Sequence, residues 1–538
     1  MAFSLIGSIS PYVTPWRGVA ALCLLPLLIV LGFYICSTPN ILRDLRRRKL
    51  PPGPTGLPFI GNLFDLADSN HVKDKAIEWW QKYGDVFYTR IGGTDYIWLS
   101  SPKAVKDLMD KKSNIYSSRP PMPLAQDTAS AGCRQVFMPY GPRHRTVRKI
   151  SHDLLNINAT AQYQPIQDVE SKQLMFELLE DPNGFYDYNR RYSASLICRI
   201  IYGERIQDWT DPLIQKIFSV LINLSDISSP GVHLIDTFPA LKILPQWMCN
   251  DWKNYARKIC EHDSGIYLEL WRDLNKKVAA GNIKPCFGKD FVEKDLEKLQ
   301  MNELEAAFHT GHLIEAGAET TSAALNSLLL ALTLYPEASK KAQEELDRVV
   351  GPNRLPTFED QDKLPYLKAL VKEGLRWRPP NQYGMHHAVV EDDWYEGMFI
   401  PKGAVVMLNW WAIHFNPEVW ENPYDFHPER YLGHPSPAAT YLNASDPSAR
   451  DHFAYGAGRR VCPGIHVAER SMFINIARIL WSFNISKKVV DGKTIEPETL
   501  CVPGWLSVPQ KFECSIIPRS EKHAEVIRRE HELTKKDI

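Results

Sequence analysis

The chain has no excess of charge of either sign. Its 538 residues carry 63 Lys and Arg against 63 Asp and Glu, so the formal net charge is zero and the pI is near 7.2. Proteins that bind nucleic acid usually gather positive charge on one face. We therefore expect no nucleic acid among the partners of this protein.

Cysteine pairs at metal-binding or disulfide spacing are also missing. The sequence holds ten cysteines, none of them in a Cys-x-x-Cys pair, and Cys23 and Cys36 fall within an N-terminal apolar run. This spacing argues against a zinc site and against a disulfide framework. No internal repeat is present either. Because the motifs described below spread from about residue 140 to 464, we expect a single large catalytic domain.

One cysteine has unusual surroundings, in the run Phe453-Ala-Tyr-Gly-Ala-Gly-Arg-Arg-Val-Cys-Pro-Gly464. Gly456, Gly458 and Gly464 would allow turns and a close approach of a flat macrocycle to the backbone. Arg459 and Arg460 would place positive charge beside the sulfur, which favours a thiolate, and a guanidinium suits a propionate carboxylate. The run predicts that Cys462 is the thiolate ligand of a haem iron. The alternative is an inert cysteine in a surface turn.

The run resembles the cysteine loop of the cytochromes P-450, the haem-thiolate monooxygenases, although Tyr455 stands where that family usually has phenylalanine. The resemblance implies a mainly α (α+β) fold, in which a helical bundle surrounds haem b beside a small β-rich lobe. It extends from about residue 50 to 518. Extended segments are expected near 86–99, 384–408 and 501–517.

Two further motifs occur in the order of the resembled family. Lys372-Glu-Gly-Leu-Arg376 places Glu373 and Arg376 three residues apart, on one face of a helix. Arg430 follows in Pro428-Glu-Arg430. The resemblance implies that Glu373, Arg376 and Arg430 form a buried ionic triad. The alternative for the pair alone is a solvated helix face.

A long apolar helix is predicted from about Leu304 to Tyr335, ended by Pro336, and it contains Gly311-His-Leu-Ile-Glu-Ala-Gly-Ala-Glu-Thr-Thr321. Small side chains recur on one face, including Gly317, where a flat cofactor could lie. A threonine hydroxyl within a helix can bond the carbonyl one turn back. The resemblance implies that Glu319 and Thr320 deliver protons during dioxygen activation. The alternative is a helix whose glutamate is paired elsewhere.

Other positions are carried over from the family with departures. Tyr140-Gly-Pro-Arg-His-Arg-Thr-Val-Arg148 resembles a helix whose tryptophan and arginine contact the haem propionates, but His144 stands in place of the tryptophan. We expect His144 and Arg148 to keep this contact. His387 and Ala388 occupy the usual His-Arg positions, which puts a second arginine contact in doubt.

The substrate pocket is assigned by resemblance alone. It implies that Tyr383, Met385, Trp505 and Leu313 line the distal side of the haem, and aromatic walls would suit a small flat ligand. The alternative is ordinary core packing. His309 and His312 lie one turn apart without a Cys or acidic residue at matching spacing, so we interpret them as ordinary helix histidines rather than metal ligands.

The N-terminus predicts a membrane anchor. Residues 18–36 are apolar and uncharged over nineteen residues, close to the ~20 that span a bilayer core. The basic cluster Arg43-Asp-Leu-Arg-Arg-Arg-Lys49 follows the apolar run, which places the catalytic domain in the cytosol and differs from a cleaved signal peptide. We expect a lumenal N-terminus at 1–17, an anchor at 18–36, a basic cluster and proline-rich hinge at 37–58, the catalytic domain at 59–518 and a charged tail at 519–538.

The sequence lacks a flavin or nicotinamide fingerprint, since Gly456-Ala-Gly458 has no third glycine at the right spacing. Electrons must then come from another protein, and the resemblance implies NADPH through an NADPH-cytochrome reductase, which would dock where the cysteine loop and Arg143, Arg145, Arg148 and Lys149 form a basic patch. The alternative is that haem propionates and local acids occupy this cluster. The resemblance to fungal microsomal enzymes favours oxidation of a small hydrophobic substrate by O2 at the endoplasmic reticulum, with an aromatic polyketide preferred. The alternatives are a reductase-independent haem-thiolate isomerase or dehydratase, a non-catalytic haem-binding membrane protein, and a haem-free membrane adaptor.

Overall fold

The computed structural model describes residues 45–58, 60–66, 72–229, 233–238, 241–242, 251–381, 383–502, 504 and 506–534. The predicted anchor at 18–36 lies outside these residues. Within the described part, no helix combines the length and the apolarity needed to cross a bilayer. Helices make up most of the described chain, and the strands form small sheets, as the mainly α prediction required.

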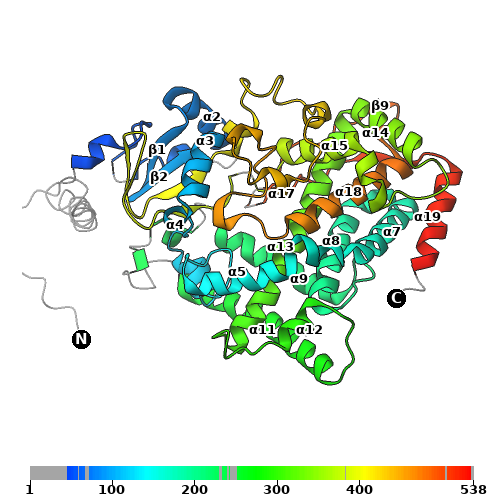
Figure 1. Cartoon of the computed structure of the whole chain (residues 1–538), viewed down its shortest axis with the longest axis horizontal. Helices are drawn as coiled ribbons and strands as arrows, with labels where there is room; N and C mark the ends of the chain where they lie inside the picture. Colours follow the sequence, from blue (N-terminus) through cyan, green and yellow to red (C-terminus); the bar gives the residue numbers. More distant parts are fainter. Residues whose placement is uncertain are drawn as a thin grey trace, which may run out of the picture.

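Helix α13 (Glu303–Leu334) runs through the middle of the molecule (Figure 1). Asn302 caps its first turn in a reciprocal hydrogen-bond pair with Glu305, and the next helix, α14 (Pro336–Val349), begins at Pro336. The predicted bounds are confirmed because an N-cap and a proline specify both ends. Helices α8 (Phe185–Tyr202), α11 (Trp252–Ala279) and α18 (Ile465–Ser482) pack against α13.

The other helices surround this centre. They are α2 (Val72–Tyr83), α3 (Pro102–Val105), α4 (Ser113–Tyr116), α5 (Pro142–Leu155), α6 (Ile157–Ala161), α7 (Gln164–Glu180), α9 (Pro212–Ser228), α10 (Leu234–Thr237), α12 (Phe287–Val292), α15 (Pro365–Trp377), α16 (Trp410–His414), α17 (Ala438–Tyr441) and α19 (Glu521–Thr534). Short 3-10 or π turns join several of them, including η3 (Lys106–Lys111), η4 (Pro123–Thr128), η9 (Pro428–Tyr431) and η11 (Gly458–Arg460).

The main sheet lies at the left of Figure 1, beside the helical part, and its strand order is β1-β2-β6-β3. Strands β1 (Val86–Ile91) and β2 (Thr94–Leu99) pair antiparallel, β6 (Val405–Leu408) runs parallel to β2, and β3 (His387–Ala388) pairs with β6. One face of this sheet packs on α2, where Phe87 and Trp98 stack with their ring centroids 5.5 Å apart. The smaller pairs are β4 (Asp393–Tyr395) with β5 (Met398–Ile400), β7 (Phe483–Lys487) with β10 (Cys514–Pro518), and β8 (Val489–Val490) with β9 (Lys493–Thr494).

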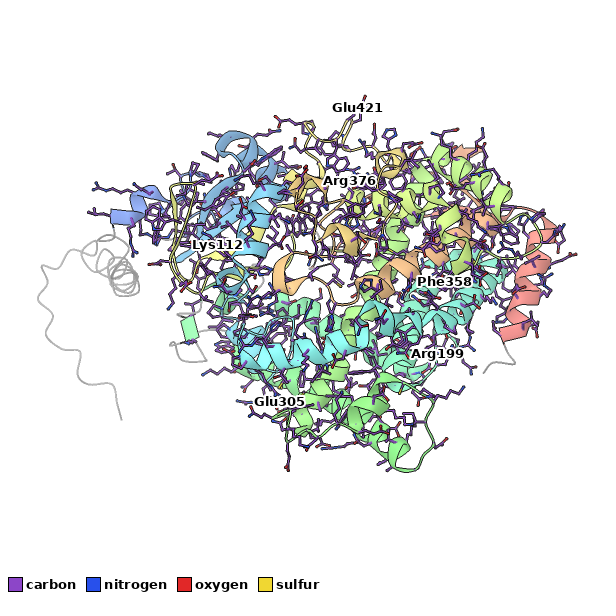
Figure 2. The ribbon with its side chains drawn as sticks, in the orientation of Figure 1. Lys112, Arg199, Glu305, Phe358, Arg376 and Glu421 are labelled. Atoms are coloured by element: carbon purple, nitrogen blue, oxygen red, sulfur yellow. The ribbon has the colours of Figure 1, made fainter. Side chains whose placement is uncertain are left out.

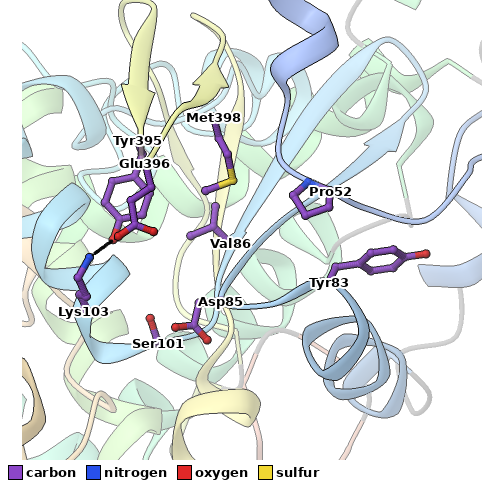
Figure 3. Close-up of a pocket in the computed structure, with 9 residues that line it drawn as sticks. All are labelled: Pro52, Tyr83, Asp85, Val86, Ser101, Lys103, Tyr395, Glu396 and Met398. Carbon is purple, nitrogen blue, oxygen red and sulfur yellow. Dashed lines mark hydrogen bonds and ion pairs between the residues drawn. The ribbon is translucent and has the colours of Figure 1, made fainter.

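The described part of the predicted hinge is packed on this lobe. In η1 (Leu45–Lys49), Arg47 forms two hydrogen bonds of 2.7 and 2.8 Å to the carboxylate of Asp95. The carbonyl of Pro52 accepts the N–H of Tyr88 at 2.9 Å. Pro52 also borders a cavity of about 160 Å³ between β1 and the β4–β5 hairpin (Figure 3). Because main-chain and ionic contacts fix this segment, residues 45–58 are part of the lobe rather than a free linker.

The C-terminal segment differs from the charged tail that the sequence predicted. Helix α19 packs on α7, with Val526 and Ile527 buried and His531 stacked on Phe176 at a centroid distance of 4.0 Å. The composition of this segment shows mainly its charged residues. Its apolar residues are few, but they share one face of α19, and only their spacing indicates a helix. Most of the region after Pro518 is therefore a docked helix.

Candidate active site

Cys462 lies in a turn between η11 and α18. Its N–H donates to the carbonyl of Tyr455 at 2.7 Å, and the N–H of Gly464 donates to its sulfur. Gly456 and Gly458 adopt left-handed backbone angles, with φ of 78° and 62°, which glycine accepts without strain. The loop thus holds the sulfur at a fixed place at the start of a buried helix.

The space left by the glycines serves protein contacts more than the sequence suggested. A Cβ on Gly458 would lie 2.2 Å from the carbonyl oxygen of Met109, and a Cβ on Gly317 would lie 2.8 Å from the side chain of Ile197 in α8. Gly458 therefore lets the loop approach η3, and Gly317 lets α13 approach α8. A Cβ on Gly464 would meet only the sulfur of Cys462, at an ordinary 3.9 Å.

The positive charge beside the sulfur comes from Arg148 rather than from Arg459 or Arg460. Arg148 donates to the carbonyl of Val461, the residue before Cys462. Burial raises the pKa of the Cys462 thiol, while the Gly464 N–H and Arg148 act in the opposite direction. A bound metal cation would deprotonate such a thiol. Arg459 instead reaches the surface and lies over the ring of Tyr140.

Three guanidinium groups, of buried Arg119 and of half-buried Arg148 and Arg460, gather near the loop and have carbonyl partners only. Arg460 donates to the carbonyls of Ser117 and Met138 at 2.9 and 2.6 Å. Arg119 donates to those of Val136 and His386 at 2.9 and 2.6 Å. Burial lowers the pKa of Arg119, Arg148 and Arg460, and no carboxylate of the described residues lies near enough to offset this.

Unpaired buried cations fit an anionic ligand, because an isolated charge is costly to bury. Two propionate carboxylates of haem b would supply the missing negative charge. His144 adds a neutral donor: burial and the neighbouring arginines lower its pKa to about 3, and its buried Nδ1 has no partner in the described part of the chain. The residues present fit the cofactor that the cysteine loop implies.

Arg119 was missed by sequence reasoning, and it answers the doubt about a second arginine. His387 is buried and bonds the carbonyl of Tyr116 through Nδ1 at 2.9 Å, next to Ala388 in β3. A guanidinium does lie beside this strand, that of Arg119 on the segment after α4, which donates to the carbonyl of His386. Its only sequence signal was a lone arginine between Ser118 and Pro120, in no recognisable motif.

The face of α13 near the loop is open where the rest of the helix is closed. From Ala306 to Thr333 nearly all residues are buried, but Ala316 is exposed and Gly317, Glu319, Thr320 and Thr321 are half-buried. Helix α18, which follows Cys462, packs on α13. A flat ligand between the cysteine loop and these small side chains would cover this opening.

Glu319 and Thr320 lie at this opening. The hydroxyl of Thr320 donates to the carbonyl of Ala316 at 2.7 Å, and the helix remains α-helical there. Glu319 lies 3.3 Å from a guanidinium nitrogen of Arg190 in α8. Burial raises the pKa of Glu319 despite the opposing effect of Arg190. Glu319 and Thr320 are thus adjacent and partly accessible, and each has a different partner.

Glu373, Arg376 (labelled in Figure 2) and Arg430 meet where α15 packs on η9. Arg376 forms two bonds of 2.7 Å to the carboxylate of Glu373, and Arg430 Nε lies 3.4 Å from the same carboxylate. Arg376 also donates to the carbonyls of His414 and Pro423, both at 2.8 Å. The triad ties the segment that leads to the cysteine loop onto α15.

Of the four predicted pocket residues, the structure describes Met385, Leu313 and Tyr383, and these three belong to different hydrophobic clusters. Met385 packs with Val136 and Leu224 in a cluster built from η4, α9 and α11. Leu313 is buried in the main core, and Tyr383 packs with the α2 and β-sheet cluster. Trp505 lies outside the described residues. A Cβ added to its neighbour Gly504 would lie 3.1 Å from the hydroxyl oxygen of Ser225 in α9. Met385 and Gly504 thus both lie near α9, whereas the side chain of Tyr383 packs with the α2 and β-sheet cluster.

Comparisons with known proteins agree with this site. A family model described as cytochrome P450 matches residues 51–514. The cytochrome P450 monooxygenase verL of Clonostachys rogersoniana is 48% identical over 489 residues, which cover 90% of each chain. The monooxygenase virE of Hypocrea virens is 38% identical, covering 90% of this chain and 88% of its own, and fogE of Aspergillus ruber is 37% identical, covering 89% of each. The Cys462 loop, the arginines that lack a carboxylate partner among the described residues and the opening on α13 agree with these matches. The chain belongs to the cytochrome P450 monooxygenase family of oxidoreductases.

Proposed function

We propose that the protein is a membrane-anchored haem-thiolate monooxygenase of fungal secondary metabolism, which inserts one oxygen atom from O2 into a small hydrophobic substrate. The observation that carries the proposal is that Arg119, Arg148 and Arg460 lie around the Cys462 loop without a carboxylate partner among the described residues, while the helix that follows the loop packs on α13. Bound haem would supply dioxygen activation, with the thiolate raising the electron density at the iron.

The protein's own side chains supply binding and proton control. Arg119, Arg148 and Arg460 would hold the propionates through charge-assisted hydrogen bonds. The Thr320 hydroxyl donates its hydrogen bond to the carbonyl of Ala316, so its oxygen can accept a hydrogen bond from a water or ligand. Glu319 can take up a proton more readily than an exposed glutamate, because burial raises its pKa.

We base the substrate class on the apolar residues that would surround the substrate. Met385 and Val136 belong to an apolar cluster with Phe137 and Ile227, and such walls favour a compact apolar ligand. An aromatic polyketide derivative is the substrate that we favour. The thioether of Met385 can adapt to several aromatic shapes.

Electrons would come from NADPH through a separate reductase. Of the four basic residues expected to form its docking patch, Arg143 pairs with Glu305 (labelled in Figure 2) and Arg148 is turned inward to Val461. Arg145 and Lys149 are exposed on α5. Together with exposed Arg459 they define the proximal basic surface, which supports docking of an acidic partner.

Attachment to the endoplasmic reticulum membrane is proposed from the apolar run at 18–36 and the basic cluster that follows it. Exposed apolar side chains in the first described segments, Leu45, Leu57 and Phe64, support contact with a membrane surface at this end of the chain.

The reduced, CO-bound spectrum tests the thiolate directly. We expect the red-shifted Soret band in the wild type and its loss in Cys462→Ala, because only a thiolate ligand gives that shift. Cys260→Ala, at a second half-buried cysteine, is the matched control and should keep the band. NADPH-dependent oxygen insertion with added reductase then separates the monooxygenase from an isomerase, a dehydratase or a non-catalytic haem protein. A band that persists in Cys462→Ala contradicts the proposal.

A further inference from the structure

A buried ionic cluster holds the side of α13 that precedes the haem site. The carboxylate of Glu315, 4% exposed, accepts bonds of 2.6 and 3.1 Å from the guanidinium of Arg134. The hydroxyl of Tyr267 in α11 donates to the same carboxylate. Arg134 also bonds Asp263 of α11 at 2.9 Å. The cluster therefore locks Glu315 in one position and ties α13 to α11 and to the segment after η4.

The remaining partner of Glu315 is His312, whose Nδ1 lies 3.2 Å from Oε2. Reading the two histidines as ordinary residues missed this acidic partner three positions along the helix. Burial would raise the pKa of Glu315, but Arg134 and His312 overcome it and bring the pKa down to about 2. An ionised carboxylate only accepts hydrogen bonds, so His312 Nδ1 must carry the proton.

The tautomer fixes the other ring nitrogen. In a neutral imidazole with hydrogen on Nδ1, Nε2 holds a lone pair and is an acceptor. In the part of the chain that the structure describes, Nε2 of His312 has no hydrogen-bond partner. A carboxylate that orients one nitrogen while the other stays open is the arrangement by which proteins aim a histidine at a ligand.

His312 lies on the open side of α13. His312 precedes Ala316 by four residues and so lies one turn away on the same face. It is half-buried, whereas residues 306–311 and 313–315 are all buried. The opening at Thr320 and Ala316 thus continues to His312. Arg134, which holds Glu315, is two residues from Val136, a member of the cluster that contains Met385.

We propose that His312 is a positioning residue whose Nε2 accepts a hydrogen bond from a substrate hydroxyl, and that the substrates are small aromatic compounds with a phenolic or alcoholic O–H. The inference rests on the proposed function, since the substrate meant is that of the monooxygenase site. A lone acceptor in apolar walls would orient the ring and so select the carbon that is oxidised. A ligand without a donor would leave Nε2 buried and unpaired, which is unfavourable.

The test compares two probes of nearly equal shape, 2-naphthol and 2-methoxynaphthalene, by calorimetry on the haem-loaded full-length protein. We expect the wild type to bind the phenol about three- to tenfold more tightly than the ether, the usual size of one net hydrogen bond. His312→Leu should bind both probes alike. His312→Gln restores an acceptor oxygen and should recover part of the preference, which a merely structural role would not do.

His309→Leu is the matched control. His309 is a histidine on the same helix, 1% exposed against Phe287 and Phe291, and should leave the preference unchanged. Equal binding of both probes by the wild type, binding of neither, or a preference that survives in His312→Leu would overturn the inference. Calorimetry does not depend on turnover. A phenol preference without oxygen insertion would refute the proposed function alone, and oxygen insertion without the preference would refute the role of His312 alone.

Discussion

At the scale of single residues, the most specific sign of the cofactor is the set of three arginines that have no carboxylate partner among the described residues, Arg119, Arg148 and Arg460. Arg119 contributes a guanidinium that donates to three carbonyls and meets no carboxylate of the described residues. Carbonyl dipoles only partly offset the cost of burying this charge. The charge is therefore best explained as one half of an ion pair whose other half arrives with the ligand.

Replacing Arg119 by Gln should weaken haem retention. A charge-assisted hydrogen bond contributes about 1.5–3 kcal/mol, so haem transfer to apomyoglobin should be roughly 10- to 100-fold faster than in the wild type. Arg119→Lys keeps the charge and should show a smaller effect. Arg354→Gln, which removes a guanidinium already paired with Asp360, is the control. Equal transfer rates for the wild type and Arg119→Gln would place Arg119 outside the propionate site.

Thr320→Ala should keep the haem spectrum but lose coupling. Removing the hydroxyl removes the acceptor oxygen held beside Ala316, so protons are delivered less selectively and NADPH electrons appear as hydrogen peroxide. The measurement is peroxide formed per NADPH consumed. Thr321→Ala changes an adjacent, equally half-buried threonine and should stay coupled. Unchanged coupling in Thr320→Ala would make Thr320 a structural residue.

Residues within short motifs could be predicted from sequence, whereas residues with distant partners could not. Glu373 and Arg376 share one helix turn, so their spacing predicted the pair that the structure shows at 2.7 Å. Arg119 and Arg134 gave no such signal, because their partners lie far away in the sequence. Gly458 and Gly317 were predicted to make room for the cofactor, yet their nearest contacts are Met109 and Ile197.

At the scale of elements, α13 shows why helix ends are easier to predict than helix partners. Asn302 and Pro336 specify its ends locally. Its docking on α11 depends instead on Glu315, Arg134 and Tyr267, a cluster that only the fold assembles. The same reason explains α19, whose contact with α7 cannot be inferred from its charged composition.

Glu315→Gln should destabilise the protein in a pH-dependent way. Its folded pKa of about 2 lies below the 4.5 of an unperturbed glutamate, so ionised Glu315 contributes stability above pH 4.5 that is lost as the pH falls towards 2. At neutral pH the difference corresponds to about 3 kcal/mol. Urea midpoints of the wild type and Glu315→Gln should differ clearly at pH 7 and converge as the pH falls from 4.5 towards 2. A gap that does not change with pH would contradict this account.

At the scale of the whole molecule, the proximal basic surface should govern electron delivery. Arg145→Glu with Lys149→Glu should lower reductase-dependent NADPH turnover by about tenfold at low salt, because charge complementarity mainly accelerates association. The gap should narrow at high salt as the charges are screened. Arg257→Glu with Lys258→Glu reverses two exposed charges on α11 and serves as the control. Equal turnover by both double variants would place the docking site elsewhere.

The predicted membrane anchor precedes the first described residues of the packed lobe. Two truncations should separate the roles of these two parts. If residues 18–36 are the anchor, deleting residues 1–44 should release the protein from the membrane pellet. The haem spectrum and the melting temperature should be unchanged, because the packed lobe begins at η1. Deleting residues 1–49 also removes Arg46, 3.0 Å from Asp392, and Arg47, which is bonded to buried Asp95.

The longer deletion should therefore give the same release with a melting temperature lower by a few degrees, since it leaves a buried carboxylate without its cation. Arg47→Gln in the full chain should reproduce the lower melting temperature while the protein stays in the pellet. Retention of the 1–44 deletion in the pellet would assign membrane binding to the catalytic domain. Equal melting temperatures for the two deletions would show that η1 adds nothing to the lobe. The two measurements thus distinguish a sequence that attaches the protein from one that completes its fold.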